Sequence, residues 1–269
     1  MTSVALESVG FTYPDGTRAL DGVDLSIPAG DAVAIIGQNG SGKSTLVRHL
    51  NGLLRPTEGR VLHDRTDVVG ERVARLAAVV GIVFQNPDRQ IFAGRVRAEV
   101  EFGPRILGRP PTEVARAATA ALEAVGLVGL ETTNPYDLGY SRRKLLSVAS
   151  VLAMETPIVV LDEPTTGQDA RGLARIQRVV AHLTASGRTV VAISHDMRFV
   201  AESFGRVVAM RAGRVILDGS PAVVFAAEHW ADLASTYVEP PLPARVGDRL
   251  GLGSTPTDAD LVEALVERH

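Results

Sequence analysis

The sequence predicts an α/β fold in which a parallel sheet is joined to an antiparallel β subdomain and to an inserted α-helical subdomain. Buried strands alternate with helical patterns, which is typical of a parallel sheet with helices on both faces; the strands are at 32–36, 80–84, 157–161 and 189–193. Two amphipathic strands precede the first of these, and they predict the antiparallel part. Between the second and third buried strands the pattern is helical, which predicts the insert.

The elements follow in a definite order. The ranges 4–13 and 20–27 alternate apolar and polar residues around the turn Pro14-Asp15-Gly16, which predicts two antiparallel strands. We expect the other elements to be a helix (46–53), a returning strand (59–62), a helix (71–78), three helices in the insert (96–103, 112–125 and 141–154), a helix (173–184), a closing hairpin (207–211 with 214–218), a short helix after Gly219, a Pro-rich passage (239–243) and a final helix (258–268). This order divides the chain into a core of 1–88 with 155–218, a helical subdomain of 89–154 and a C-terminal extension of 219–269.

Composition and charge narrow the classes of function. The chain has 269 residues, of which 45% are hydrophobic, and this is enough for a buried core. The absence of cysteine excludes disulfides and thiolate metal sites. A net charge of −3 gives no overall basic footprint, so nucleic acid is disfavoured as the main ligand. No apolar run approaches the roughly 20 residues that span a bilayer, and no signal-peptide pattern is present, so we expect any membrane role to depend on a partner.

A phosphate-binding motif follows the first buried strand. Two glycines with four residues between them precede Lys and Ser, in the run Gly37-Gln38-Asn39-Gly40-Ser41-Gly42-Lys43-Ser44-Thr45. The glycines let the backbone curl so that its N–H groups and the next helix N-terminus point at a β-phosphate. Lys43 is expected to reach the β- and γ-phosphates, and Ser44 to offer its hydroxyl to Mg²⁺. The alternative is a glycine-rich turn without a ligand.

Two carboxylates end the third buried strand. Asp162 and Glu163 come at the C-terminal end of that strand, where parallel sheets place their ligands. Adjacent residues of an extended chain point to opposite faces, so we expect different roles for the two acids. Asp162 is expected to hold Mg²⁺ and Glu163 to polarise the attacking water. A helix cap or a surface charge is the alternative for each.

Together these motifs resemble the ATPase subunit of an ABC transporter. The resemblance rests on 161–169 (Leu-Asp-Glu-Pro-Thr-Thr-Gly-Gln-Asp), the phosphate-binding motif, Gln85 and His195, and it extends over about 4–218. The segments 84–92 and 101–104, with the tail 241–267, are similar to the energy-coupling factor and cobalt-type subfamily. The resemblance implies the ABC ATPase fold, with a RecA-like P-loop NTPase core.

The resemblance also implies roles for three further residues. Gln85 would contact Mg²⁺ and the attacking water, His195 would contact the γ-phosphate, and Asp169 would lie at a dimer interface. Without the resemblance, Gln85 would be interpreted as a turn residue, His195 as a capping residue and Asp169 as a helix N-cap. Tyr13, near the end of the first strand, is either an aromatic that stacks on adenine or a residue of the core.

The chain departs from the family in the signature motif. Where the family has Leu-Ser-Gly-Gly-Gln, this chain has Leu138-Gly139-Tyr140-Ser141-Arg142. Gly139 lacks the hydroxyl, and Tyr140 is expected to obstruct close backbone approach. Gly139, Ser141 and Arg142 would face the ATP held by a partner chain, and losing one donor there costs roughly 100-fold to 1000-fold in rate. Arg142, Arg143 and Lys144 place three cations near a helix N-terminus, where the helix dipole disfavours them. Either Arg142 binds the partner's triphosphate, or these charges are solvated or paired with Asp137.

The resemblance implies an ATP-binding and ATP-hydrolysing subunit of an energy-coupling factor importer, peripheral at the cytoplasmic face of the membrane. Its cofactors would be ATP and Mg²⁺, and its cargo a vitamin or a transition metal ion. We expect a second ATPase subunit with an intact signature, so a heterodimer is favoured over a homodimer, and integral membrane partners, with no nucleic acid. Two alternatives remain open: a soluble ABC ATPase not linked to transport, and a regulatory ATP-binding subunit with little hydrolysis.

Overall fold

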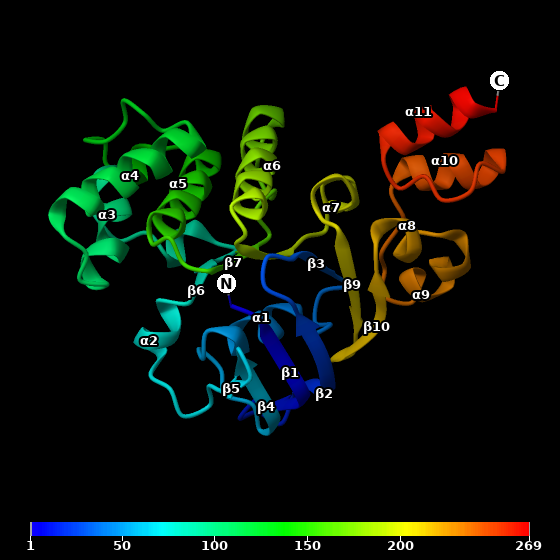
Figure 1. Cartoon of the computed structure of the whole chain (residues 1–269), viewed down its shortest axis with the longest axis horizontal. Helices are drawn as coiled ribbons and strands as arrows, with labels where there is room; N and C mark the ends of the chain where they lie inside the picture. The colour runs from blue at the N-terminus through cyan, green and yellow to red at the C-terminus, as the bar shows by residue number, and fades with distance from the viewer. Residues whose placement is uncertain (1, 269) are drawn as a thin grey trace.

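The computed structural model describes residues 2–268, which form two sheets and the helices around them (Figure 1). The smaller sheet is antiparallel, in the order β2-β1-β4-β5. Its strands are β1 (Val4–Thr12), β2 (Arg18–Ile27), β4 (Glu58–His63) and β5 (Thr66–Asp67). In β1, Val4 pairs with Ile27 of β2 and with His63 of β4. The predicted antiparallel pair and the returning strand are therefore confirmed.

The predicted motifs follow the ends of strands that belong to the larger sheet. Its order is β10-β9-β3-β8-β7-β6, and its strands are β3 (Ala32–Ile36), β6 (Val80–Val83), β7 (Ile158–Asp162), β8 (Thr189–Ile193), β9 (Arg206–Arg211) and β10 (Arg214–Gly219). The strands from β9 to β6 are parallel, and β10 forms an antiparallel hairpin with β9. Because parallel strands end at one edge of a sheet, the segments after β3, β6, β7 and β8 meet there.

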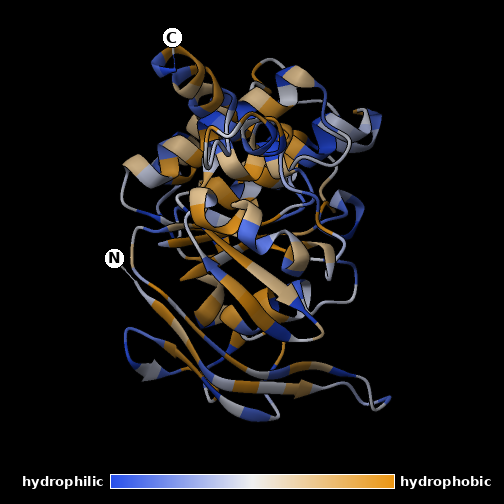
Figure 2. Cartoon of the chain, turned by 90° about the vertical axis from the view of Figure 1, so that its right-hand side faces the viewer, coloured by the Kyte–Doolittle hydropathy of each residue, from blue (hydrophilic) through white to orange (hydrophobic). Residues whose placement is uncertain are grey.

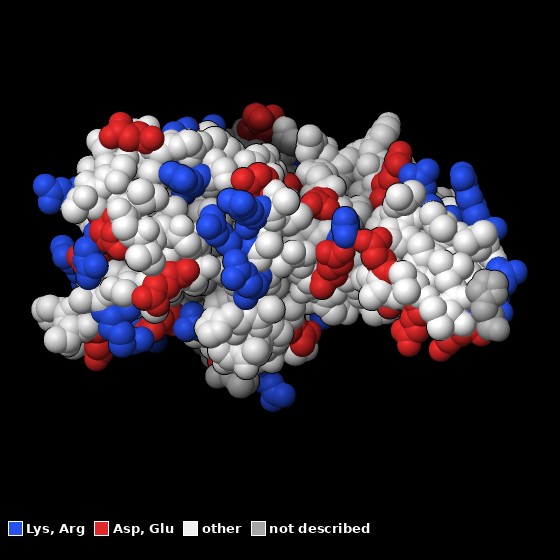
Figure 3. Space-filling view, turned by 90° about the horizontal axis from the view of Figure 1, so that it is seen from above, with Lys and Arg blue, Asp and Glu red and all other residues white. Residues whose placement is uncertain are grey.

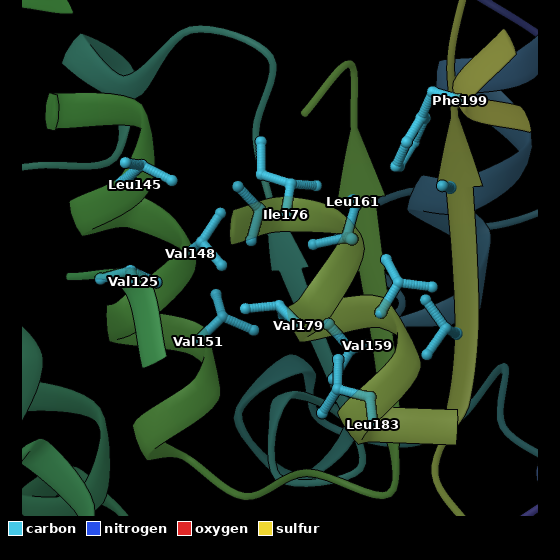
Figure 4. Packing of buried hydrophobic residues seen from close by; sticks show 14 of the residues in the cluster. Val125, Leu145, Val148, Val151, Val159, Leu161, Ile176, Val179, Leu183 and Phe199 are labelled. Atoms are coloured by element: carbon cyan, nitrogen blue, oxygen red, sulfur yellow. The ribbon is translucent and has the colours of Figure 1, made fainter. Parts of the chain in front are cut away.

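The two faces of this sheet are covered differently. On one face, helices α5 (Tyr140–Ala153), α6 (Ala170–Ala185) and α7 (Met197–Ser203) share a hydrophobic core with apolar strand residues, and α4 (Pro111–Val125) packs on α5 and α6. Figure 4 shows Val148 and Val151 of α5 directed toward α6. On the other face, α1 (Lys43–Leu50) and the antiparallel sheet share a core with Val33 and Ile35. In Figure 2 the strands of the larger sheet are coloured mainly as hydrophobic. The prediction of helices on both faces is therefore incomplete, because on the second face the apolar side of β1 and β2 covers the larger sheet together with α1.

The segment between β6 and β7 is largely helical, as the sequence predicts. After the short helix α2 (Val73–Ala77) and β6, it contains α3 (Val96–Ile106), α4 (Pro111–Val125) and α5 (Tyr140–Ala153). Pro111 lies in the first turn of α4, and Gly126, with a φ of 67°, ends that helix. These positions are favourable because proline needs no N–H partner at a helix start and glycine tolerates the left-handed conformation.

The C-terminal part contains two helices that the sequence pattern did not predict. Its helices are α8 (Pro221–Val224), α9 (Trp230–Ala234), α10 (Leu242–Leu250) and α11 (Asp258–Glu267). The Pro-rich passage opens α10, with Pro241 at its N-cap and Pro243 in its first turn. Proline is tolerated at these positions, so the passage starts a helix instead of forming a loop. Figure 1 shows α10 and α11 on the side of the molecule opposite α3 and α4.

The surface mixes charges of both signs. On the face in Figure 3, acidic and basic side chains are interspersed, with one compact basic cluster near the middle. Within residues 2–268, no helix combines the length and the apolarity that crossing a bilayer requires.

Candidate functional site

The phosphate-binding motif forms a tight loop between β3 and α1. Gly37 has a φ of 140°, and a Cβ there would lie 2.3 Å from the carbonyl oxygen of Met210. Gly42 has a φ of 103°, and a Cβ there would lie 2.6 Å from the carbonyl oxygen of Ala19. Only glycine fits at these two positions, because both the backbone conformation and the space exclude a side chain.

The loop presents hydrogen-bond donors to the space beside it. Gly42 caps α1 without a side-chain hydrogen bond, so the first N–H groups of the helix are available to an anion. The Lys43 ammonium is buried and donates to the carbonyls of Gly37 at 2.6 Å and Gln38 at 2.8 Å. Burial lowers the pKa of Lys43, and the charges of Glu163 and Asp162 oppose that shift. The buried hydroxyl of Ser41 has no hydrogen-bond partner among the described residues. A triphosphate would supply acceptors for the helix N–H groups and the Ser41 hydroxyl.

Asp162 and Glu163 face the same cavity, so the expectation that they point to opposite faces is wrong. Asp162 ends β7 in extended conformation, whereas Glu163 has a φ of 50°, which turns its side chain back toward the loop. A non-glycine residue in this region is strained, and such strain is concentrated at functional sites. Burial raises the pKa of Asp162 and raises that of Glu163 to about 7. Asp162 Oδ1 is buried and has no hydrogen-bond partner in the described part of the chain.

His195 lies beside Glu163 at the end of β8. Its Nε2 is 3.2 Å from Glu163 Oε1, and its backbone N–H donates to Glu163 Oε2 at 3.3 Å. Burial and the nearby Lys43 charge lower the pKa of His195, so its ring is neutral at neutral pH. The side chain that caps α7 is Asp196, which accepts from the N–H of Phe199. The interpretation of His195 as a capping residue is therefore wrong.

Most of the predicted site residues line one cavity of about 290 Å³. It is lined by the loop residues Asn39, Gly40, Ser41, Gly42, Lys43, Ser44 and Thr45 and by Gln85, Asp162, Glu163, Thr166, Ile193 and His195. Thr166 was missed, because a threonine three residues after the acid has no separate signal in the sequence. A second space of about 450 Å³ shares Ser44, Gln85 and Asp162 and adds Arg48 and Arg89. Ser44, Gln85 and Asp162 therefore line both spaces.

Tyr13 and Asp169 are two of the predicted residues that do not line this cavity; the others are Gly37, Gln38, Gly139, Ser141 and Arg142. The Tyr13 hydroxyl lies 3.0 Å from Thr45 Oγ1, and its half-buried ring packs edge-on against Phe11. Asp169 caps α6 by accepting from the N–H of Gly172 at 2.7 Å, which confirms the N-cap interpretation. Their expected roles toward adenine and at a dimer interface remain proposals.

The altered signature packs against the turn after β7 in the same chain. Gly139 caps α5, and the ring of Tyr140 covers Gly167 so closely that a Cβ there would lie 2.7 Å from it. Ser141 donates its hydroxyl to Gln168 Oε1 at 2.8 Å, and its carbonyl accepts from Gln168 Nε2 at 3.2 Å. The start of α5 is thus tied to the segment that leads from Glu163 to α6.

Two of the three cations near this helix start have partners inside the chain. Arg143 Nε lies 3.0 Å from Asp88 Oδ1, so the acid that pairs is Asp88 and not Asp137. Lys144 is fully buried, and its ammonium donates to the carbonyls of Phe84, Gln85 and Asp162. Burial lowers the pKa of Lys144 to about 8. Arg142 is exposed and makes no hydrogen bond or ion pair with any residue in 2–268.

Lys144 joins the segment after β6 to the end of β7, so we expect its replacement to lower the stability of the fold. Replacing Lys144 by Met keeps the bulk and leaves the carbonyls of Phe84, Gln85 and Asp162 without this donor. We expect the free energy of unfolding to fall by about 2–4 kcal/mol, measured by urea denaturation. Arg142→Met on the same helix is the matched control and should change it by less than about 0.5 kcal/mol. Equal stability of the Lys144→Met variant would mean that desolvation of the cation cancels its hydrogen bonds.

Comparison with known proteins decides the family. The family described as ABC transporter matches residues 20–166. The chain is 42% identical over 224 residues to the energy-coupling factor transporter ATP-binding protein EcfA of Methanothermobacter thermautotrophicus, covering 82% of this chain and 72% of that protein. The chain belongs to the ABC transporter family of ATPases. A second ABC ATPase, EcfA2 of Symbiobacterium thermophilum, is 40% identical over 92% of this chain and 88% of its own length.

Longer relatives and solved structures agree with this assignment. The chain spans 39% of the length of a putative ABC transporter ATP-binding protein of Methanosarcina acetivorans, to which it is 41% identical. Among solved structures, cbiO1 of Clostridium perfringens, described as part of the ABC transporter complex cbiONQ, has a TM-score of 0.76 and 34% identity over 92% of this chain and 98% of that one. The ATP-binding cassette MJ0796, solved as a dimer with ADP and Pi, has a TM-score of 0.74 and 28% identity over 81% of this chain and 98% of that one. The ABC ATPase fold predicted from the sequence is confirmed.

Proposed function

We propose that this chain binds and hydrolyses Mg-ATP as a peripheral subunit of an energy-coupling factor importer, at the cytoplasmic face of the membrane. The observation that carries the proposal is the single cavity that holds Lys43, Gln85, Asp162, Glu163 and His195. The relatives named as energy-coupling factor ATP-binding proteins support the transport role. A vitamin or a transition metal ion is the cargo that this subfamily implies.

The residues of the cavity fit a magnesium ion. Asp162 Oδ1 is buried without a hydrogen-bond partner among residues 2–268, and Ser44 and Gln85 line the same two spaces as Asp162. Mg²⁺ prefers such oxygen ligands and retains waters beside phosphates. Ser44, Asp162 and Gln85 would hold it, and when bound it would neutralise charge on the phosphates. Lys43 would exchange the carbonyls of Gly37 and Gln38 for the β- and γ-phosphates.

Glu163 is the proposed general base. Its pKa of about 7 matches a group that accepts a proton at neutral pH. The water oxygen attacks the γ-phosphorus, the bond from that phosphorus to the ADP oxygen breaks, and the water proton passes to Glu163. His195, 3.2 Å from Glu163, would hold the γ-phosphate and orient the water.

The signature region supports a heterodimer. Gly139 has no hydroxyl and the ring of Tyr140 covers Gly167, so this chain offers a poor surface to a partner's ATP. An opposing chain with an intact signature would complete the site on this chain's own loop. Asp169 would lie at that interface, Tyr13 would stack on adenine, and Gly139, Ser141 and Arg142 would face the partner's ATP. Arg142 is suited to a triphosphate because it is exposed and has no partner in the described part of the chain.

An apolar groove is the proposed contact for the membrane partner. A cavity of about 240 Å³ lies between α2, β6, α3 and α5, and its lining includes Phe92 and Phe102, which are 59% and 45% exposed. Phe84 and Gln90 form one of its walls, and Gln85 lies between them in the chain. A partner seated in this groove would therefore contact the segment that carries Gln85 into the nucleotide cavity.

Replacing Phe102 by Asp tests this contact. We expect association with the membrane partner to weaken about 10-fold to 100-fold, because the change removes an exposed aromatic anchor and adds a charge. The affinity for ATP, measured on the isolated chain, should stay within about twofold, since Phe102 does not line the nucleotide cavity. Val128→Asp is the control, because Val128 is 60% exposed and lies outside the groove. Unchanged recovery of membrane proteins with the Phe102→Asp chain would contradict the proposal.

A further inference from the structure

The C-terminal extension reaches the phosphate loop through one side chain. Thr236 follows α9 and is fully buried. Its hydroxyl accepts a hydrogen bond from the N–H of Gln38 at 3.1 Å and donates one to the carbonyl of Met210 at 2.7 Å. The first contact joins residues 198 positions apart in the sequence.

A buried turn fixes the position of Thr236. The carbonyl of Leu233 accepts from the N–H groups of Thr236 and Val238, both at 3.0 Å, and Tyr237 between them has a φ of 53°. Leu233 is 0% exposed and Val238 is 6% exposed, and both belong to the main hydrophobic core. The hydroxyl of Thr236 is therefore held by the packing of the extension and not by the loop alone.

The contact lies directly behind the groups that would meet the nucleotide. The carbonyls of Gly37 and Gln38 accept from the Lys43 ammonium, while Met210 occupies the space where Gly37 would carry a Cβ. Thr236 bonds to both Gln38 and Met210, so it joins the first turn of the loop to β9. The N–H of Gln38 shares a peptide unit with the carbonyl of Gly37, so the bond to Thr236 also orients the carbonyl that accepts from Lys43.

We propose that Thr236 is a positioning residue for nucleotide binding, and that the C-terminal extension is thereby part of the ATP site. The proposal rests on the phosphate loop being the ATP site. Thr236 holds the peptide unit between Gly37 and Gln38 in the orientation that phosphates require, so nucleotide binding needs to order less of the loop. A shift of the extension would move this peptide and change the affinity for ATP.

The test replaces Thr236 by Val, which keeps the shape and removes both hydrogen bonds. We expect the Kd of a non-hydrolysable ATP analogue with Mg²⁺, measured by calorimetry on the chain of residues 1–269, to rise about 5-fold to 10-fold. Hydrogen exchange at the Gln38 amide should become faster in the nucleotide-free chain. Thr236→Ser keeps the hydroxyl and should restore both values. If the Val variant does not fold, Thr236→Ala replaces it, because it also removes the hydroxyl.

Leu122→Ala separates positioning from general destabilisation. Leu122 is buried in α4, outside the extension and outside the nucleotide cavity, so this variant should lower the melting temperature while the Kd stays near wild type where the chain is folded. A Thr236→Val chain that binds the analogue as wild type does, or a Leu122→Ala chain that loses affinity equally, would overturn the positioning role. A wild-type chain that fails to bind the analogue would overturn the proposed function, and this link with it.

Discussion

Replacing Glu163 by Gln should reduce ATP hydrolysis at this chain's own site about 100-fold to 10,000-fold, because the amide cannot accept the proton of the attacking water. ATP affinity should change little, since the phosphates are held by the loop and Lys43. Dimer closure should also persist, because the substitution keeps the shape of the side chain. Hydrolysis by the assembled complex and binding of ATP are the two measurements.

The control for this variant is Glu239→Gln. Glu239 is an exposed acid whose side chain pairs with Arg245, and it lies outside the nucleotide cavity. Its loss should leave hydrolysis unchanged. Full ATP turnover at this chain's site in the Glu163→Gln variant would rule out Glu163 as the general base. Loss of ATP binding would indicate that the substitution disturbs the phosphate loop.

Restoring the signature should have the second large effect. The combined change Gly139→Ser, Tyr140→Gly, Ser141→Gly and Arg142→Gln supplies a hydroxyl and removes the ring that covers Gly167. We expect hydrolysis of the partner's ATP to rise about 100-fold to 1000-fold, which is the value of one lost donor to the transition state.

The Glu163→Gln background isolates this effect. In that background the remaining turnover of the complex comes from the ATP on the partner's loop, which faces the signature of this chain. Tyr140→Phe is the matched control, because it keeps the ring on Gly167 and should not raise the rate. If the four combined substitutions do not raise the hydrolysis rate, the altered signature is not what slows hydrolysis at the partner's site.

Much of the site could be predicted because its signals are local. The phosphate loop needs glycine at Gly37 and Gly42 whatever surrounds it, and a strand that ends in Asp162 brings its carboxylate to the edge of a parallel sheet. The shared direction of Asp162 and Glu163 could not be predicted, because it depends on a positive φ at Glu163 that the residue type does not favour.

Other features depend on contacts between distant parts of the chain. The three adjacent cations mark Lys144 as a charge near a helix start. They do not indicate that its ammonium donates hydrogen bonds to the carbonyls of residues 84, 85 and 162. The bond from Thr236 to Gln38 has no signal in the sequence, because the two residues are brought together by the packing of the extension. Helix α10 was missed because three prolines in the 239–243 passage indicate a loop unless their places at the helix start are known.

Affinity purification of this chain from detergent-solubilised native membranes, followed by identification of the proteins that accompany it, tests the central claim most directly. The account predicts integral membrane proteins together with a second ATPase that carries an intact Leu-Ser-Gly-Gly-Gln signature. Recovery of the chain only from the soluble fraction, alone or with nucleic acid, would contradict the assignment to an importer.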